Sequence, residues 1–103
     1  MGTRILSAAK FRIIEIWNYT EAAWDEPQAD KYVRELIEVM QRLGSKRGGW
    51  KPVPDPALKG VFFVKHAHHF IFFKELTSGD IGVITVLHES MDLPSRLRQD
   101  AGE

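Results

Sequence analysis

The sequence contains no cysteine among its 103 residues, which excludes disulfides, thiolate metal sites and a cysteine nucleophile. It has no excess of either charge, because 14 Lys and Arg residues balance 14 Asp and Glu residues. A zero net charge argues against a histone-like protein that binds nucleic acid through bulk positive charge. No apolar run approaches the ~20 residues of a membrane span, and the N-terminus lacks a secretory signal pattern. We therefore expect a cytoplasmic protein without membrane contacts.

The composition that is present is typical of a folded domain. Hydrophobic residues make up 44% of the chain and charged residues 27%, close to the averages for soluble globular proteins. The length is sufficient for one hydrophobic core but not for two. We predict a single domain over residues 1–103.

The spacing of the apolar residues predicts two helices in the first half of the chain. One runs from Ser7, a candidate N-cap, to about Trp24, with apolar residues recurring at helical spacing. The other begins around Asp25, which has capping-box spacing with Gln28, and ends at Gly44. Because the connection is so short, the two helices must fold back as a hairpin.

The periodicity changes after Gly60, where three runs rich in β-branched and aromatic residues predict antiparallel strands. These runs cover residues 61–64, 70–73 and 81–87. A short strand at residues 4–6 would complete the sheet, and the Gly- and Pro-rich segment from Gly44 to Gly60 is typical of an ordered loop. The sheet is needed to cover the apolar stripes of the helices, so the sequence predicts a two-layer α+β fold.

Four histidines cluster in the predicted strand region, but they form only a weak metal signal. No cysteine or nearby ligand pattern completes a zinc site, so we expect solvated or hydrogen-bonded histidines, no metal and no cofactor. The order His88, Glu89, Ser90, Asp92 suggests a catalytic triad, yet such short spacing points the side chains in different directions. The four histidines are His66, His68, His69 and His88.

The three tryptophans differ in their surroundings. Trp17 and Trp24 lie on the apolar face of the first predicted helix, and their default interpretation is core. Trp50 lies among glycines and lysines in the loop and is the tryptophan best placed to contact a partner.

Several stretches of the chain together resemble the ParE toxins of the RelE/ParE superfamily. They are Ile16-Trp17-Asn18-Tyr19, Trp24 followed by Gln28-Ala29 and Tyr32, His69-Phe70-Ile71-Phe72-Phe73, and Val83-Ile84-Thr85-Val86-Leu87-His88-Glu89-Ser90-Met91-Asp92. The resemblance implies the RelE/ParE-like fold and a toxin of a type II toxin–antitoxin pair. It further implies inhibition of DNA gyrase, neutralisation by a ParD-like antitoxin and a hetero-oligomer with that antitoxin.

The superfamily also contains ribosome-dependent mRNA endonucleases of the RelE and YoeB kind. The resemblance places Phe70 and Glu89 where such enzymes carry arginines, and Ser95 near the position of their C-terminal tyrosine. Phe70 cannot donate a hydrogen bond to a phosphate, and Glu89 would repel one. We therefore predict no catalytic residues and no enzyme activity, with the endonuclease as the alternative function.

Two sets of residues are candidates for partner contacts. An antitoxin segment is expected to cover exposed apolar positions on the hairpin and the final strand, namely Trp24, Tyr32 and Val83. Gyrase holds polyanionic DNA, so basic residues in the loop and in a flexible tail at residues 94–103 are expected to face the target. These basic residues are Lys46, Arg47, Lys51, Arg96 and Arg98.

Overall fold

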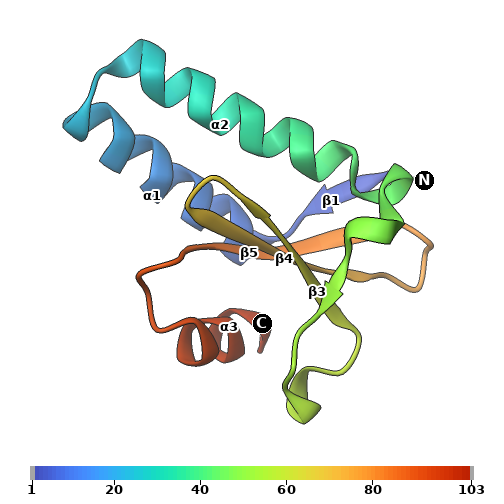
Figure 1. The fold of residues 1–103 in the computed structure, drawn as a ribbon. Helices are drawn as coiled ribbons and strands as arrows, with labels where there is room; N and C mark the ends of the chain where they lie inside the picture. Colours follow the sequence, from blue (N-terminus) through green and yellow to red (C-terminus); the bar gives the residue numbers. More distant parts are fainter. Residues whose placement is uncertain (1, 103) are drawn as a thin grey trace.

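The computed structural model describes residues 2–102 and contains one mixed sheet with helices on both faces (Figure 1). The elements in chain order are β1 (Thr3–Ile5), α1 (Ser7–Ala23), α2 (Glu26–Gln41), β2 (Lys51–Pro52), β3 (Val61–His66), β4 (His69–Glu75), β5 (Ile81–His88) and α3 (Leu93–Ala101). Short 3-10 helices lie at Leu43–Ser45, Arg47–Gly49 and Pro56–Leu58, within the segment that we predicted as a loop.

The strands are ordered β1-β5-β4-β3-β2 across the sheet. β1 runs parallel to β5, and the other neighbouring strands are antiparallel. This topology confirms the predicted α+β fold with an N-terminal strand, a helical hairpin and antiparallel strands. The edge strand β2 lies in the segment that we predicted as a loop. Its proline argues against a strand in the sequence, but proline is tolerated in a sheet at an edge.

The helical hairpin begins and ends close to the predicted positions. The Asp25 carboxylate accepts a hydrogen bond of 2.9 Å from the Gln28 backbone N–H, so the predicted cap of α2 is confirmed. Ser7 is not the N-cap of α1, because Leu6 holds that position and no side chain caps the helix. α2 ends at Gln41, and a 3-10 helix then leads the chain through Gly44.

The main core lies between the hairpin and the sheet. Its buried side chains come from both helices and from the helix-facing sides of β4 and β5. The fully buried members include Leu36, Met40, Ile71, Phe73 and Val83. The hairpin thus covers one face of the sheet, as its apolar stripes predicted.

A second, smaller core lies on the opposite face of the sheet, under α3 (Figure 1). The segment that we predicted as a flexible tail, residues 94–103, contains most of this helix. Pro94 occupies the first turn of α3, where its missing N–H costs little, and Leu97 is buried against the sheet. Pro94 therefore starts a helix instead of a tail.

A β-bulge in β5 determines which residues of this strand face each core. Phe72 is paired with Thr85 and Phe73 with Val83, which leaves Ile84 as the extra residue. Val83 consequently faces the hairpin, whereas Ile84 and Thr85 both face α3. The bulge thereby aims the Thr85 hydroxyl at Asp100 of α3, to which it donates a hydrogen bond of 2.7 Å.

Candidate functional site

A groove of about 650 Å³ lies between α1, the first turns of α2 and the ends of β4 and β5. We call it the hairpin groove; its lining includes Tyr19, Trp24, Tyr32, His69, His88 and Met91. Trp24 is 77% exposed and Tyr19 75% exposed. Large exposed aromatic side chains beside a groove are typical of a surface that another protein covers.

Trp24 is not a core residue, contrary to its default interpretation. It follows α1 as the C-cap, where its backbone N–H bonds to the Thr20 carbonyl, and its side chain remains open to solvent. Trp17, in contrast, is half-buried and donates its indole N–H to Asp30 at 2.9 Å, which ties α1 to α2. Trp24 therefore stays a predicted partner contact, and Trp17 has a structural role.

Tyr32 and His69 form the floor of the hairpin groove. A hydrogen bond of 2.6 Å joins the Tyr32 hydroxyl to His69 Nδ1. Burial raises the pKa of Tyr32, and burial together with the neighbouring His88 lowers the pKa of His69 to about 4. At neutral pH both groups are therefore uncharged, and this floor offers a neutral polar surface to a partner.

The other histidines are also engaged in local contacts. His66, His69 and His88 lie in register across the ends of three strands, and His66 Nε2 lies 3.8 Å from Glu35. His68 contacts Glu89 at 2.6 Å, and the hydrogen bond from Lys65, with that from His68, lowers the pKa of Glu89 to about 2. Within residues 2–102, no three His, Asp or Glu side chains are grouped so as to hold a metal ion.

The contact between His88 and Ser90 belongs to a turn and does not resemble a catalytic pair. The Ser90 hydroxyl lies 2.7 Å from His88 Nδ1, and the Ser90 backbone N–H donates to the same nitrogen at 3.0 Å. This bond to the backbone holds the side chain in the tight turn after β5. No acidic group in the described residues accepts a hydrogen bond from the His88 ring, so the third member of a triad is missing there.

Of the predicted contact residues, Val83 is fully buried and Trp50 is partly buried. Val83 has 0% of its surface exposed and lies under the hairpin, so it cannot be an antitoxin contact on an exposed strand. Trp50 packs edge-on against Phe73 with ring centroids 4.8 Å apart, and its indole N–H donates to the Leu43 carbonyl. Trp50 therefore anchors the loop to the main core.

The predicted basic residues divide into two groups. Lys46, Arg47 and Lys51 are exposed in and after the 3-10 segment, where Arg47 stacks over Trp50 and pairs with Glu75 at 3.1 Å. Arg96 and Arg98 are exposed on α3.

Arg98 connects α3 with the segment that follows β2. Its guanidinium lies 2.9 Å from Asp55, whose pKa is lowered by the Ala57 backbone N–H and by Arg98. The structure thus brings Arg98 of α3 next to the segment that follows Lys51 and strand β2.

Other side chains occupy the positions at which the endonuclease alternative would need two arginines and a tyrosine, namely Phe70, Glu89 and Ser95. Phe70 packs edge-on against Phe63 at 5.7 Å between ring centroids, and Lys65 lies over the Phe70 ring while pairing with Glu89 at 2.9 Å. Ser95 is exposed on α3. The face therefore presents aromatic carbon and a neutralised ion pair, which do not stabilise the charge of a cleaved phosphate.

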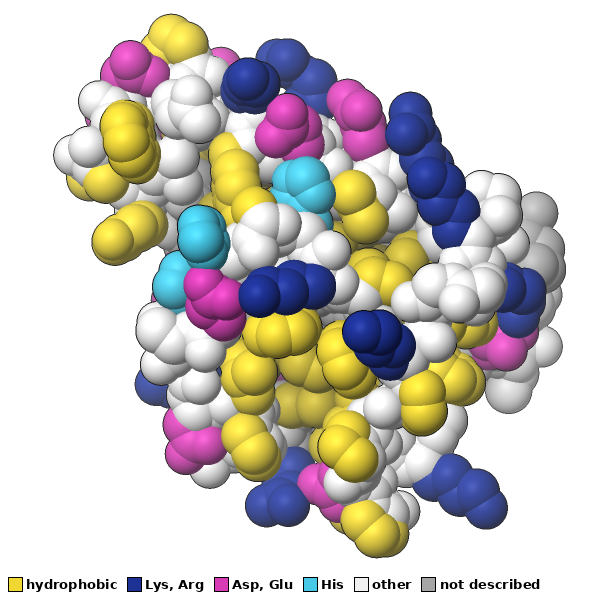
Figure 2. Space-filling model, viewed as in Figure 1, with side chains coloured by type: hydrophobic (Ala, Val, Ile, Leu, Met, Phe, Trp, Pro, Cys, Tyr) yellow, Lys and Arg dark blue, Asp and Glu magenta, His cyan; other side chains and the backbone are white. Residues whose placement is uncertain are grey.

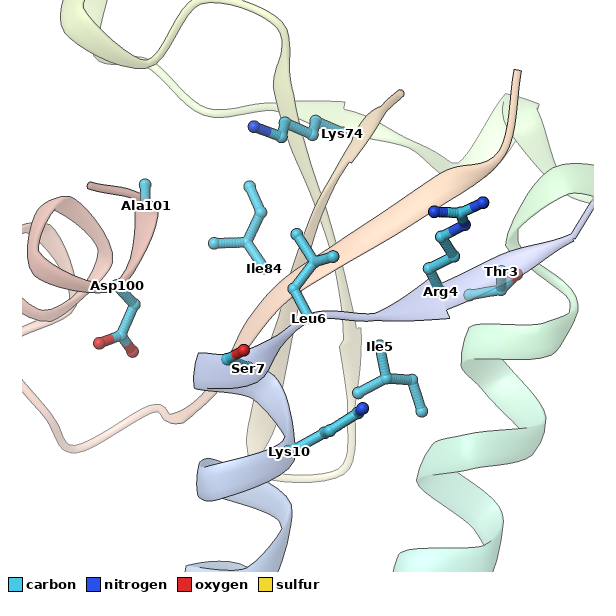
Figure 3. A pocket seen from close by; sticks show the side chains of 10 residues that line it. All are labelled: Thr3, Arg4, Ile5, Leu6, Ser7, Lys10, Lys74, Ile84, Asp100 and Ala101. Atoms are coloured by element: carbon cyan, nitrogen blue, oxygen red, sulfur yellow. The ribbon is translucent and has the colours of Figure 1, made fainter. Parts of the chain in front are cut away.

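Another pocket, of about 780 Å³, lies between β1 and the end of α3 (Figure 3). Arg4 and Lys74 lie opposite Gly82 from the strands on either side of β5, and Leu6 and Ile84 provide an apolar wall. Its acid, Asp100, is already bonded to Arg12 and Thr85. The carboxylate of this pocket is therefore already paired.

Arg12 and Asp100 form a buried ion pair that the sequence did not reveal. Arg12 donates to Asp100 through Nε at 3.0 Å and through Nη2 at 3.3 Å, and it also donates to Glu15. These bonds, the one to Asp100 foremost, raise the pKa of Arg12. Arg12 and Asp100 are 88 positions apart, so no local sequence pattern could have paired them. Tyr19, a lining residue of the hairpin groove, follows Arg12 and Glu15 at helical spacing, and this spacing could have identified it as a residue of the same helix face.

Comparisons with known proteins agree with the fold and identify a family. Residues 4–93 match the family model described as the ParE toxin of the type II toxin–antitoxin system parDE. The chain is 31% identical over 100 residues to Toxin ParE of Escherichia coli, with 94% of each chain covered. It is 30% identical over 99 residues to Toxin ParE1 of Mycobacterium tuberculosis, with 94% of this chain and 100% of that protein covered.

Solved structures share the fold at lower identity. A chain of the chromosomal ParDE system from P. aeruginosa superimposes with a TM-score of 0.71 at 14% identity, covering 85% of this chain and 95% of the other. The toxin–antitoxin complex RelBE2 from Mycobacterium tuberculosis gives 0.63 at 12% identity, covering 84% and 95%.

Proposed function

The chain belongs to the ParE toxin family of type II toxin–antitoxin systems, and we propose that it inhibits DNA gyrase in the cytoplasm and is neutralised by a ParD-like antitoxin. In this proposal the toxin acts by binding and performs no chemical step. The two partners use different faces of the molecule.

The observation that carries the antitoxin part is the apolar exposure of α1 and of the hairpin groove. Phe11, Ile14, Tyr19 and Trp24 are each 59% exposed or more, and all belong to α1 or its C-cap. Isolated exposed apolar residues are common, but four on one helix next to a groove favour a covered surface. Tyr19 and Trp24 line this groove, so an amphipathic antitoxin segment that places apolar side chains in it would bury these two aromatic residues. The solved ParDE system has the same fold.

Two observations support a binding role in place of nuclease activity. The face around Phe70 and Glu89 has aromatic and paired charged groups where the alternative needs free guanidinium groups. The described histidines are held by Tyr32, Glu89 or Ser90, or lie near Glu35. No membrane enters the proposal, and among the described helices none is long and apolar enough to cross one.

The gyrase assignment is tested with purified components. Supercoiled plasmid and gyrase are incubated with the toxin, and the proposal predicts accumulation of cleaved plasmid that added antitoxin prevents. In parallel, cleavage of mRNA in a translation mixture, with gyrase unaffected, would favour the endonuclease alternative.

A further inference from the structure

A second groove, of about 420 Å³, lies on the face of the sheet opposite the hairpin. Residues 53–58 form one wall, residues 93–98 at the start of α3 form the other, and Phe63, Phe70 and Phe72 form the floor. We call it the α3 groove. The only charged side chains in its lining are Asp55 and Arg98, and they pair with each other.

The floor of the α3 groove suits an aliphatic or aromatic side chain better than a nucleic acid base. Phe63 meets Phe70 edge-on, and Phe72 is only 5% exposed, so the rings pack against one another. Stacking of bases requires open ring faces, whereas burial of an apolar side chain needs only a concave apolar surface.

Figure 2 shows an apolar patch on this face, with basic and acidic side chains at its edges. Lys51 is the register partner of Phe63 and Lys65 that of Phe70, so both lysines project from the face that carries the groove. Arg96 lies three residues after Leu93 on the same helix, α3. Lys65 and Arg98 have acidic partners, but no acidic side chain in residues 2–102 forms an ion pair with Lys51 or Arg96. The rim therefore retains positive charge on both sides.

We propose that the α3 groove docks an acidic segment of the toxin's target protein, with a large apolar side chain inserted between residues 53–58 and α3. This inference rests on the proposed toxin function and names the surface and the chemistry of its target contact. The apolar floor would supply the affinity, and Lys51 and Arg96 would select acidic neighbours of the inserted side chain. The groove lies on the other face of the sheet from the hairpin groove, so the two surfaces do not share residues.

The proposal explains why basic residues far apart in the sequence belong together. Lys51 and Arg96 are separated by 45 positions, yet the Asp55–Arg98 pair holds their segments on either side of one groove. Arg47 is not part of this rim, because it stacks over Trp50, which packs on the main core, and pairs with Glu75.

The test uses the full-length toxin and two groove variants. Leu58→Glu places a carboxylate in the groove wall, and the double variant Lys51→Glu with Arg96→Glu reverses the rim charge. The matched control is Lys31→Glu with Arg34→Glu, which makes the same charge change on exposed positions of α2. Each variant is assayed for thermal unfolding, affinity for the cognate antitoxin, affinity for purified gyrase and growth inhibition at equal expression. Binding of a fluorescein-labelled single-stranded oligonucleotide is measured as well.

We expect both groove variants to lose growth inhibition and to bind purified gyrase about tenfold more weakly or worse, with antitoxin affinity and unfolding temperature close to wild type. The control should inhibit growth like the wild type. Full growth inhibition by both groove variants would overturn the inference, as would selective loss of antitoxin binding or oligonucleotide binding that depends on the rim. If wild-type toxin inhibits growth without affecting gyrase, the gyrase assignment fails, and the growth comparison alone decides on the α3 groove.

Discussion

Replacing Asp100 with alanine should destabilise the whole domain and release α3 from the sheet. The Asp100 carboxylate accepts hydrogen bonds from Arg12 Nε at 3.0 Å, Arg12 Nη2 at 3.3 Å and the Thr85 hydroxyl at 2.7 Å. The Arg12 side chain is 11% exposed and that of Asp100 is 9% exposed, so the pair is largely shielded from water. Asp100→Ala would leave the Arg12 guanidinium buried with only Glu15 as a partner.

The expected cost follows from that unpaired charge. Removing one partner of a buried ion pair typically costs about 3–5 kcal/mol, and the lower end applies here because α3 can swing away and let water reach Arg12. For a domain of this size, a loss of about 3 kcal/mol lowers the unfolding temperature by roughly 12 °C or more.

Urea unfolding followed by circular dichroism measures the free energy, and amide hydrogen exchange reports on α3. Arg98→Ala is the control, because it breaks an exposed pair on the same helix and should have a much smaller effect. In the double variant Arg12→Ala with Asp100→Ala, the combined cost should be smaller than the sum of the single costs by about 1–3 kcal/mol. The reasoning is refuted if Asp100→Ala costs less than about 1 kcal/mol and the α3 amides stay protected.

Three further predictions concern the hairpin side of the sheet. Val83→Ala should lower the free energy of unfolding by about 2 kcal/mol, because it leaves a cavity in the main core, while calorimetry shows unchanged antitoxin affinity. Trp24→Ala should instead weaken antitoxin binding by about 2 kcal/mol or more, with an unchanged unfolding temperature; equal affinity would remove Trp24 from the interface. The pKa of His69 is lowered from 6.5 to about 4, so between these pH values the unfolded chain binds a proton at His69 and the folded chain does not. The free energy of unfolding should therefore fall as the pH drops from about 6.5 to about 4. His69→Gln should flatten the stability profile in that window, and an unchanged slope would show that other groups cause it.

Much of the fold could be predicted because its elements carry local signals. The Asp25 cap and Pro27 define the start of α2, and the β-branched runs after Gly60 define the antiparallel strands. The helix α3 was not predicted, because a proline after a strand is equally compatible with the end of regular structure and with the first turn of a helix. Only the contacts of Leu97 and Asp100 with the sheet, which are not local in sequence, decide for the helix.

The candidate site was less predictable, because exposure depends on where the sheet ends. Trp24 has the helical spacing of a core residue, but it lies at the C-cap of α1, where its side chain stays open to solvent. For Val83 the sequence did hold a warning. A continuous apolar strand is typical of burial on both faces, and residues 81–87 are all buried. The α3 groove could not be foreseen, since it needs the pairing of Arg98 with Asp55.

We propose that this ParE-family chain poisons gyrase by binding and not by cutting RNA. The most direct measurement is the fraction of supercoiled plasmid that purified gyrase leaves cleaved after the toxin is added and the reaction is stopped with detergent and protease. We predict cleaved plasmid in proportion to the toxin, its loss when antitoxin is present in excess, and intact mRNA in a parallel translation mixture. Unchanged gyrase activity together with cleaved mRNA would contradict the claim.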